Sequence, residues 1–157
     1  PEFAHDLAAY QKAKGLDDAA VAILAHSQDG VSKYVTREVY EDKILKSGLV
    51  TGAKGSNDVF TVPKIWADQL DHYAKGNMQK YAEKLGLDVN LMKDKELVRL
   101  DMPFKFNQNP RLPSGAEAGA NQFFKPGGFT SGGIPEVIID ALPLAEGIVV
   151  KTLGVLK

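Results

Sequence analysis

A glycine-rich segment near the end of the chain constrains the fold more than any other feature. Residues 125–133, with the sequence KPGGFTSGG, hold four glycines in nine positions. Glycine at this density indicates a backbone that adopts positive φ angles or approaches a neighbour closely. A tight hairpin needs at most two such residues, so our first hypothesis is a functional loop equipped with Lys125, Thr130 and Ser131. The alternative is a wide loop between two strands.

Composition excludes several classes of chemistry. The length of 157 residues predicts a single domain. The absence of cysteine excludes disulfides, thiolate metal sites and cysteine nucleophiles, and the three histidines show no metal-binding spacing. We therefore expect no metal and no cofactor. A formal net charge of −1 does not by itself indicate a nucleic-acid-binding protein, and no apolar run approaches the ~20 residues of a membrane span.

Hydrophobic periodicity predicts a helix-rich first part of the chain, up to about residue 102, and a second part made of loops and strands. We expect helices at 3–14, 17–27, 37–47, 64–75 and 78–85, and strands at 33–36, 58–62, 97–102, 136–140 and 147–156. This order predicts an α+β fold, with N-terminal helices packed on a small twisted antiparallel sheet formed mainly by the C-terminal half. We expect one domain, 1–157, with a helical lead-in at 1–48 and a catalytic α+β core at 49–157.

Three cations, Lys105, Arg111 and Lys125, lie among five phenylalanines between residues 104 and 129. This combination is typical of proteins that stack single-stranded bases and pair with their phosphates. Lys105 and Lys125 are therefore candidate RNA-binding residues. Arg111 lies between two prolines, where a guanidinium can hold a phosphate through two hydrogen bonds. The alternative is that most of the phenylalanines belong to the core.

The sequence of the segment 109–136 also resembles that of a known family. Its residues NPRLPSG, followed by GANQFFKPGGFTSGGIPE, resemble the C-terminal ends of bacterial polymorphic toxins. More narrowly, the segment is similar to the tRNase toxin domain of CdiA proteins, the effectors of contact-dependent growth inhibition. The resemblance implies a metal-independent ribonuclease that acts on tRNA, a cognate immunity protein, and for some members a requirement for elongation factor Tu. It also implies delivery from the surface of the producing cell into the cytoplasm of a target cell.

One position departs from this family. The resemblance implies a histidine near the last strands, yet the chain has no histidine after His72. Ala141 stands at the expected place, so we interpret it as a His→Ala replacement in an inactivated nuclease. A native alanine there would count against the nuclease hypothesis. The predicted reaction is attack of a ribose 2′-hydroxyl on its own phosphate, with Arg111 stabilising charge and with Thr130 and Ser131 donating hydrogen bonds.

Two further hypotheses stay open. Arg37, the strand around Thr61 and the late Glu136 resemble the site of mono-ADP-ribosyltransferases, which implies NAD-dependent ADP-ribosyl transfer or NAD hydrolysis. Ile134 stands two residues before Glu136, where that family is expected to have an acidic residue or a glutamine. The third hypothesis is a non-enzymatic module that docks another protein through exposed phenylalanines and the glycine-rich surface.

Overall fold

The computed structural model describes residues 2–114, 128–130, 132–145 and 148–155. These residues form an α+β fold around a five-stranded antiparallel sheet, which confirms the predicted fold class. The strand order is β5 (Val137–Ile139), β3 (Val59–Pro63), β1 (Val31–Thr36), β4 (Glu96–Met102) and β7 (Val149–Val155). A second antiparallel ladder joins β2 (Leu49–Val50) to β6 (Leu142–Pro143).

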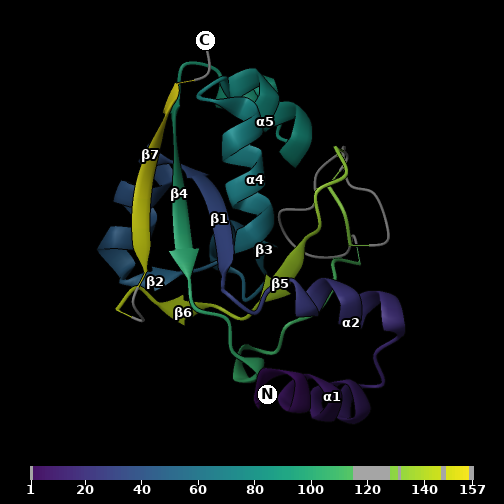
Figure 1. Cartoon of the computed structure of the whole chain (residues 1–157). Helices are drawn as coiled ribbons and strands as arrows, with labels where there is room; N and C mark the ends of the chain where they lie inside the picture. The colour runs from purple at the N-terminus through teal and green to yellow at the C-terminus, as the bar shows by residue number, and fades with distance from the viewer. Residues whose placement is uncertain (1, 115–127, 131, 146–147, 156–157) are drawn as a thin grey trace.

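Two consecutive helices, α4 (Lys64–Ala74) and α5 (Met78–Leu85), pack on one face of the sheet (Figure 1). Leu70 of α4 and Tyr81 of α5 are buried together with Leu97 of β4. Burial of apolar side chains at about 25 cal/mol per Å² is the main force that holds these helices on the sheet. The short helix α6 (Val89–Met92) connects them to β4.

The opposite face of the sheet carries the larger core. Successive side chains of a strand point to opposite faces of the sheet. On this face, β1 buries Val31 and Val35, and β4 buries Val98 and Leu100. The helix pair α1 (Glu2–Lys14) and α2 (Asp18–Ala25) closes one end of this core. Figure 1 shows both helices at the lower end of the sheet, beside the turn η3 (Phe106–Gln108).

Side chains cap the N-terminal ends of two helices. The side chain of Asp17 accepts a hydrogen bond from Ala20 N at 2.8 Å, and Thr36 accepts one from Val39 N at 3.2 Å. The predicted helix 37–47 is helical over its whole range but irregular, since the π-helical turn η1 (Tyr40–Leu45) follows α3 (Arg37–Val39). Among the described residues, no helix has the length and apolar character needed to cross a membrane.

The division of the chain at residue 48 does not correspond to a structural boundary. β1 precedes that residue, yet it is the middle strand of the sheet and pairs with both β3 and β4. The expected lead-in therefore contributes the central strand of the core. A lone helical lead-in would need only local contacts, whereas β1 obtains its hydrogen bonds from segments that follow it by tens of residues.

Candidate functional site

The sheet opens between β1, its middle strand, and the neighbouring strand β3. On its other side, β1 pairs with β4 from Val31 to Thr36. Its pairing with β3 joins Val31 to Pro63 and Ser32 to Val62, and this register does not extend to Lys33. The two strands therefore separate beyond Ser32, and the separation creates space within the sheet itself.

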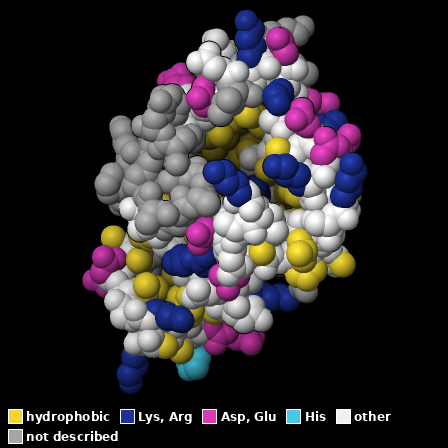
Figure 2. All heavy atoms as spheres, turned by 180° about the vertical axis from the view of Figure 1, so that it is seen from behind, with side chains coloured by type: hydrophobic (Ala, Val, Ile, Leu, Met, Phe, Trp, Pro, Cys, Tyr) yellow, Lys and Arg dark blue, Asp and Glu magenta, His cyan; other side chains and the backbone are white. Residues whose placement is uncertain are grey.

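A pocket of about 510 Å³ lies at this opening, a volume within the usual range for small-molecule sites. Figure 2 shows a hollow with a hydrophobic floor and basic side chains along its edge. Residues 32–35 of β1 and 60–62 of β3 line the pocket from the two strands. The turn η1, the segment 51–55, the end of α5, Thr130 and Glu136 complete its lining.

Lys33 is the central charged group of this pocket. Its Nζ donates a hydrogen bond of 3.5 Å to the carbonyl oxygen of Phe60, across the gap between the strands. Burial lowers the pKa of Lys33 to about 8, and the negative charge of Glu136 opposes part of this shift. Lys33 and Glu136 thus form an interacting pair in one pocket, with the lysine titrating close to neutral pH.

Two more lysines stand at the pocket's edge. Lys43 comes from η1 and Lys54 from the short turn η2 (Ala53–Gly55), and both side chains are exposed. Apolar residues also line the pocket, among them Val35, Ile44, Val62, Leu85 and Leu87. A site with this lining suits an anion that carries an uncharged, apolar part, such as a nucleotide.

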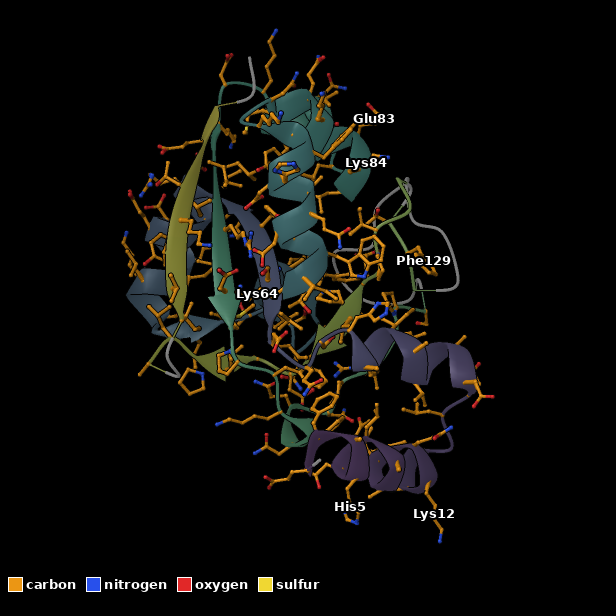
Figure 3. The ribbon with its side chains drawn as sticks, viewed as in Figure 1. His5, Lys12, Lys64, Glu83, Lys84 and Phe129 are labelled. Carbon is orange, nitrogen blue, oxygen red and sulfur yellow. The ribbon has the colours of Figure 1, made fainter. Side chains whose placement is uncertain are left out.

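Two glycines in the described part of the glycine-rich segment have a structural reason, one through packing and the other through its backbone conformation. A Cβ on Gly132 would lie 2.4 Å from Lys84 Cα and 2.5 Å from the Glu83 carbonyl oxygen, so this residue must be glycine for the chain to meet α5. Gly128 has φ +81°, a conformation that glycine adopts without strain. Figure 3 shows Phe129 on the outer side of this segment, below Glu83 and Lys84. The segment therefore docks on α5 and borders the pocket.

Thr130 lies in the pocket wall, although its hydroxyl is already engaged. The Oγ1 atom donates a hydrogen bond to the Lys84 carbonyl and accepts one from Ile134 N at 3.1 Å. The side chain is buried, so its main effect is to fix the glycine-rich segment against α5. Ser131 and Lys125, the other two candidates of that segment, lie outside the described residues.

The structure does not bring the predicted RNA-cleavage residues into one cleft. Arg111 is absent from the pocket lining, because its guanidinium is held by two carboxylates elsewhere. Its Nη2 lies 2.5 Å from Asp58 Oδ1 and its Nη1 lies 2.9 Å from Asp140 Oδ1. With both carboxylates in place, the role of Arg111 is to join the start of β3 to the end of β5. We therefore move the candidate site from Arg111 to the pocket.

Ala141 belongs to the same group as Arg111. Its backbone N–H donates a hydrogen bond of 2.8 Å to Asn57 Oδ1, and the Asn57 carbonyl accepts from Arg111 Nη2 at 3.1 Å. Ala141 and Arg111 are thus neighbours, but neither lines the pocket that contains Thr130. Lys105, the other candidate RNA-binding residue, is exposed just before η3 and does not line the pocket either.

The residues expected for NAD chemistry are separated in a similar way. Thr61 and Glu136 both line the pocket, and the buried Thr61 hydroxyl donates to the Val137 carbonyl at 2.7 Å. Arg37 does not line it. Its Nε donates to Glu96 Oε2 at 2.9 Å, and this contact holds α3 beside β4.

A buried ionic network on the other face of the sheet was not anticipated from the sequence. Arg99 of β4 is fully buried and pairs with Asp101 at 2.7 Å, Asp68 at 2.6 Å and Asp71 at 2.5 Å. Tyr34 donates to Asp71 at 3.0 Å, which ties β1 to α4 through the same network. Each of these groups has a partner, so the network holds the layer of helices in a defined position on the sheet.

Histidine and metal sites add nothing to the pocket. His26 Nδ1 accepts a hydrogen bond from Trp66 Nε1 at 3.0 Å, and Figure 3 shows His5 pointing outward from α1. Within the described ranges, no three or more His, Asp or Glu side chains are grouped to hold a metal ion.

Comparisons with protein-family models, with curated proteins and with solved structures gave no match. The pocket therefore has to be interpreted from its own chemistry.

Proposed function

We propose that the chain is a toxin domain that cleaves tRNA without a metal ion, and that the pocket between β1 and β3 is its active site. The observation that carries this proposal is that Lys33 and Glu136 line the same pocket and interact electrostatically there. RNA cleavage by 2′-hydroxyl attack requires one proton acceptor and one proton donor close together. A carboxylate and a lysine with a lowered pKa meet both requirements near neutral pH.

In the proposed reaction, the Glu136 carboxylate accepts the proton of the ribose 2′-hydroxyl, whose oxygen attacks the adjacent phosphorus. The bond to the 5′-oxygen breaks, and the Lys33 ammonium donates a proton to that leaving oxygen. The products are a 2′,3′-cyclic phosphate and a free 5′-hydroxyl, and no water is consumed. Lys43 and Lys54, at the edge of the pocket, stabilise the phosphate charge.

The overall charge of the protein bears on its partners. A formal net charge of −1 provides little general attraction for RNA, whose binding depends mainly on phosphate contacts. We therefore include elongation factor Tu, which already holds aminoacyl-tRNA, as a proposed partner. A cognate immunity protein that blocks the pocket, and delivery into the cytoplasm of a target cell, belong to the same proposal.

The test is cleavage of total tRNA by the full chain, with and without elongation factor Tu and in the presence of EDTA. We expect fragments that end in a 2′,3′-cyclic phosphate. Lys33→Met and Glu136→Gln should each slow cleavage by about 10²–10⁴-fold, the usual contribution of a general acid or base. Intact tRNA under both conditions, from protein shown to be folded by circular dichroism, would reject the nuclease proposal.

Matched variants separate the pocket from its surroundings. Lys43 lines the pocket, whereas Lys46 lies three residues further on, is exposed and contacts Asp42 at 4.0 Å. We expect Lys43→Met to weaken cleavage and Lys46→Met to leave it unchanged. Ala141→His tests whether that position replaces a catalytic histidine, because a gain of tenfold or more would place the acid–base group beside Arg111 and count against the pocket.

NAD-dependent ADP-ribosyl transfer or NAD hydrolysis is the second candidate. It is favoured by one observation, the presence of Thr61 and Glu136 in the lining of the same pocket. Release of nicotinamide from NAD, abolished by Glu136→Gln and unaffected by Arg37→Met, would support this candidate in place of the nuclease. Release of nicotinamide at the buffer rate would reject it.

A further inference from the structure

We infer that the opening between β1 and β3 is a nucleobase subsite, in which the main chain of Tyr34 and Phe60 recognises the base. This inference rests on the proposed function for the class of ligand, a ribonucleotide, and adds how the base is held. It is argued from the alternation of hydrogen-bonding directions along the two strands.

The direction on β1 follows from its first contacts with β3. Lys64 N donates to the Gly30 carbonyl at 2.9 Å, and Ser32 is paired with Val62. Residues of an antiparallel strand direct their N–H and C=O groups alternately to the two neighbouring strands. Tyr34, two residues after Ser32, therefore directs its backbone groups toward β3.

The direction on β3 follows from its other neighbour. Ile138 of β5 exchanges both backbone hydrogen bonds with Arg111, at 2.9 and 2.8 Å, and so directs its groups away from β3. Val59 and Thr61, which stand opposite Ile139 and Val137, therefore make the hydrogen bonds to β5. Phe60 lies between them and directs its backbone groups toward β1.

Tyr34 and Phe60 thus direct their backbone groups toward each other where the ladder has stopped. The register between β1 and β3 ends at Ser32, and the Phe60 carbonyl accepts its hydrogen bond from the side chain of Lys33. Backbone groups that a ladder leaves unpaired bond to water or to a ligand, so a ligand that offers a matching donor and acceptor would be held at this place.

The opening is also held in position from behind. The Tyr34 hydroxyl donates to Asp71 Oδ1 at 3.0 Å, and the Tyr81 hydroxyl donates to the same atom at 2.7 Å. The side chain of Tyr34 is therefore anchored to α4 and α5, on the face of the sheet opposite to Lys33. A strand anchored in this way keeps its distance from β3 without a ligand.

The lining of the opening fits a planar heterocycle. Apolar side chains stand on both sides, with Val39 and Ile44 from α3 and η1, and Leu85 and Leu87 from α5 and the residues after it. A nucleobase offers donors and acceptors along its edge and apolar faces for such side chains. Its phosphate would then lie toward Lys43 and Lys54, at the mouth of the same pocket.

The experiment uses the full chain labelled with ¹⁵N and the four ribonucleoside 5′-monophosphates as probes. Ribose 5-phosphate is the matched control, because it has the same sugar and phosphate without a base. We expect at least one nucleotide to shift the amide signals of Tyr34 and Phe60 and to slow their hydrogen exchange at least tenfold. Ribose 5-phosphate should leave both amides unchanged, and the paired amides of Ser32 and Val62 should stay protected throughout.

The outcomes separate this inference from the proposed function. If tRNA is cleaved but no nucleotide affects Tyr34 and Phe60, or if ribose 5-phosphate affects them equally, the subsite is rejected while the nuclease stands. If nucleotides protect these amides but tRNA stays intact, the subsite stands and the nuclease is rejected. In the free protein, an amide of Tyr34 that exchanges as slowly as that of Ser32 would also reject the subsite.

Discussion

The ammonium of Lys33 lies 3.5 Å from the carbonyl oxygen of Phe60, at the point where β1 and β3 separate. The Lys33 side chain thus donates to a carbonyl that would accept the next backbone hydrogen bond if the ladder continued. Desolvation of this ammonium lowers the pKa of Lys33 to about 8. The same desolvation has a cost in stability and provides a group that exchanges protons near neutral pH.

Replacement of Lys33 by methionine should stabilise the protein while it removes activity. The pKa of Lys33 is lowered in the folded state, so the folded protein binds this proton less tightly than the unfolded chain. The cost is therefore complete below pH 8 and disappears as the pH rises toward 10.5. We expect Lys33→Met to raise the free energy of unfolding by roughly 1–2 kcal/mol at pH 7, allowing for solvent screening, and by less at pH 10.

Urea unfolding at both pH values measures this difference. Lys46→Met is the control, since the Lys46 side chain is 75% exposed and its replacement should change little at either pH. A Lys33→Met variant that is destabilised at pH 7, or whose effect is the same at pH 7 and pH 10, would contradict a buried charge in the pocket.

The rate of RNA cleavage should fall at alkaline pH. If Lys33 donates the proton to the leaving oxygen, its protonated form is the active one, and this form decreases above pH 8. Single-turnover cleavage measured from pH 6.5 to 9.5 should therefore decrease about tenfold per pH unit beyond the pKa. A rate that instead rises through pH 8–9 would assign Lys33 the opposite role, as the base for the 2′-hydroxyl.

Local sequence signals were sufficient for most of the elements. The caps at Asp17 and Thr36 act through neighbouring backbone amides, so a short window of sequence contains the whole interaction. The buried strands β3 and β4 also stand within a residue or two of their predicted ranges. Less regular elements are harder to predict from the sequence. The π-helical turn after Val39, for example, has no simple sequence pattern.

The candidate site depends on contacts that the sequence does not display. Lys33 lies on a strand from which Glu136 is separated by about a hundred residues of chain, and nothing local relates the two. One signal was present, however. Lys33 alternates with Val31 and Val35, both buried, so a period-2 pattern places a lysine on the inner face of a strand. The flanking prolines make Arg111 a candidate from the sequence, but only the fold shows Asp58 and Asp140 around it.

Arg99→Met should destabilise the protein more than any of the other substitutions proposed for this chain. Arg99 is fully buried and is the shared partner of three carboxylates, Asp68, Asp71 and Asp101. Its removal leaves Asp68 with Lys64, at 3.1 Å, and Asp101 with Lys151, at 3.4 Å, while Asp71 loses its guanidinium. Removal of one partner from a buried ionic group costs about 3–5 kcal/mol. Thermal or urea unfolding at pH 7 measures the loss.

The exposed ion pair between Lys95 and Glu38, at 3.3 Å, provides the control. Lys95→Met should change the free energy of unfolding by at most about 1 kcal/mol. The pH dependence gives a second check. Burial raises the pKa of Asp101, but hydrogen bonds from Ser32 and Arg99 outweigh it, and the net pKa is lowered. Stability from this group is complete above pH 4 and is lost as the pH falls through the lowered pKa, and Arg99→Met should weaken that acid dependence.

Arg111→Met distinguishes a structural arginine from a phosphate clamp. In the structure, Arg111 neutralises Asp58 and Asp140 and is only 28% exposed, so its loss should cost roughly 2–3 kcal/mol of stability. The double variant Arg111→Met with Asp140→Asn should recover part of this loss, because it also removes one of the unpaired carboxylates. Cleavage of tRNA at a temperature where Arg111→Met is folded should stay within about twofold of the wild-type rate, since the residue lies outside the pocket. Normal stability combined with a hundredfold slower cleavage would return Arg111 to the active site, where the sequence alone places it.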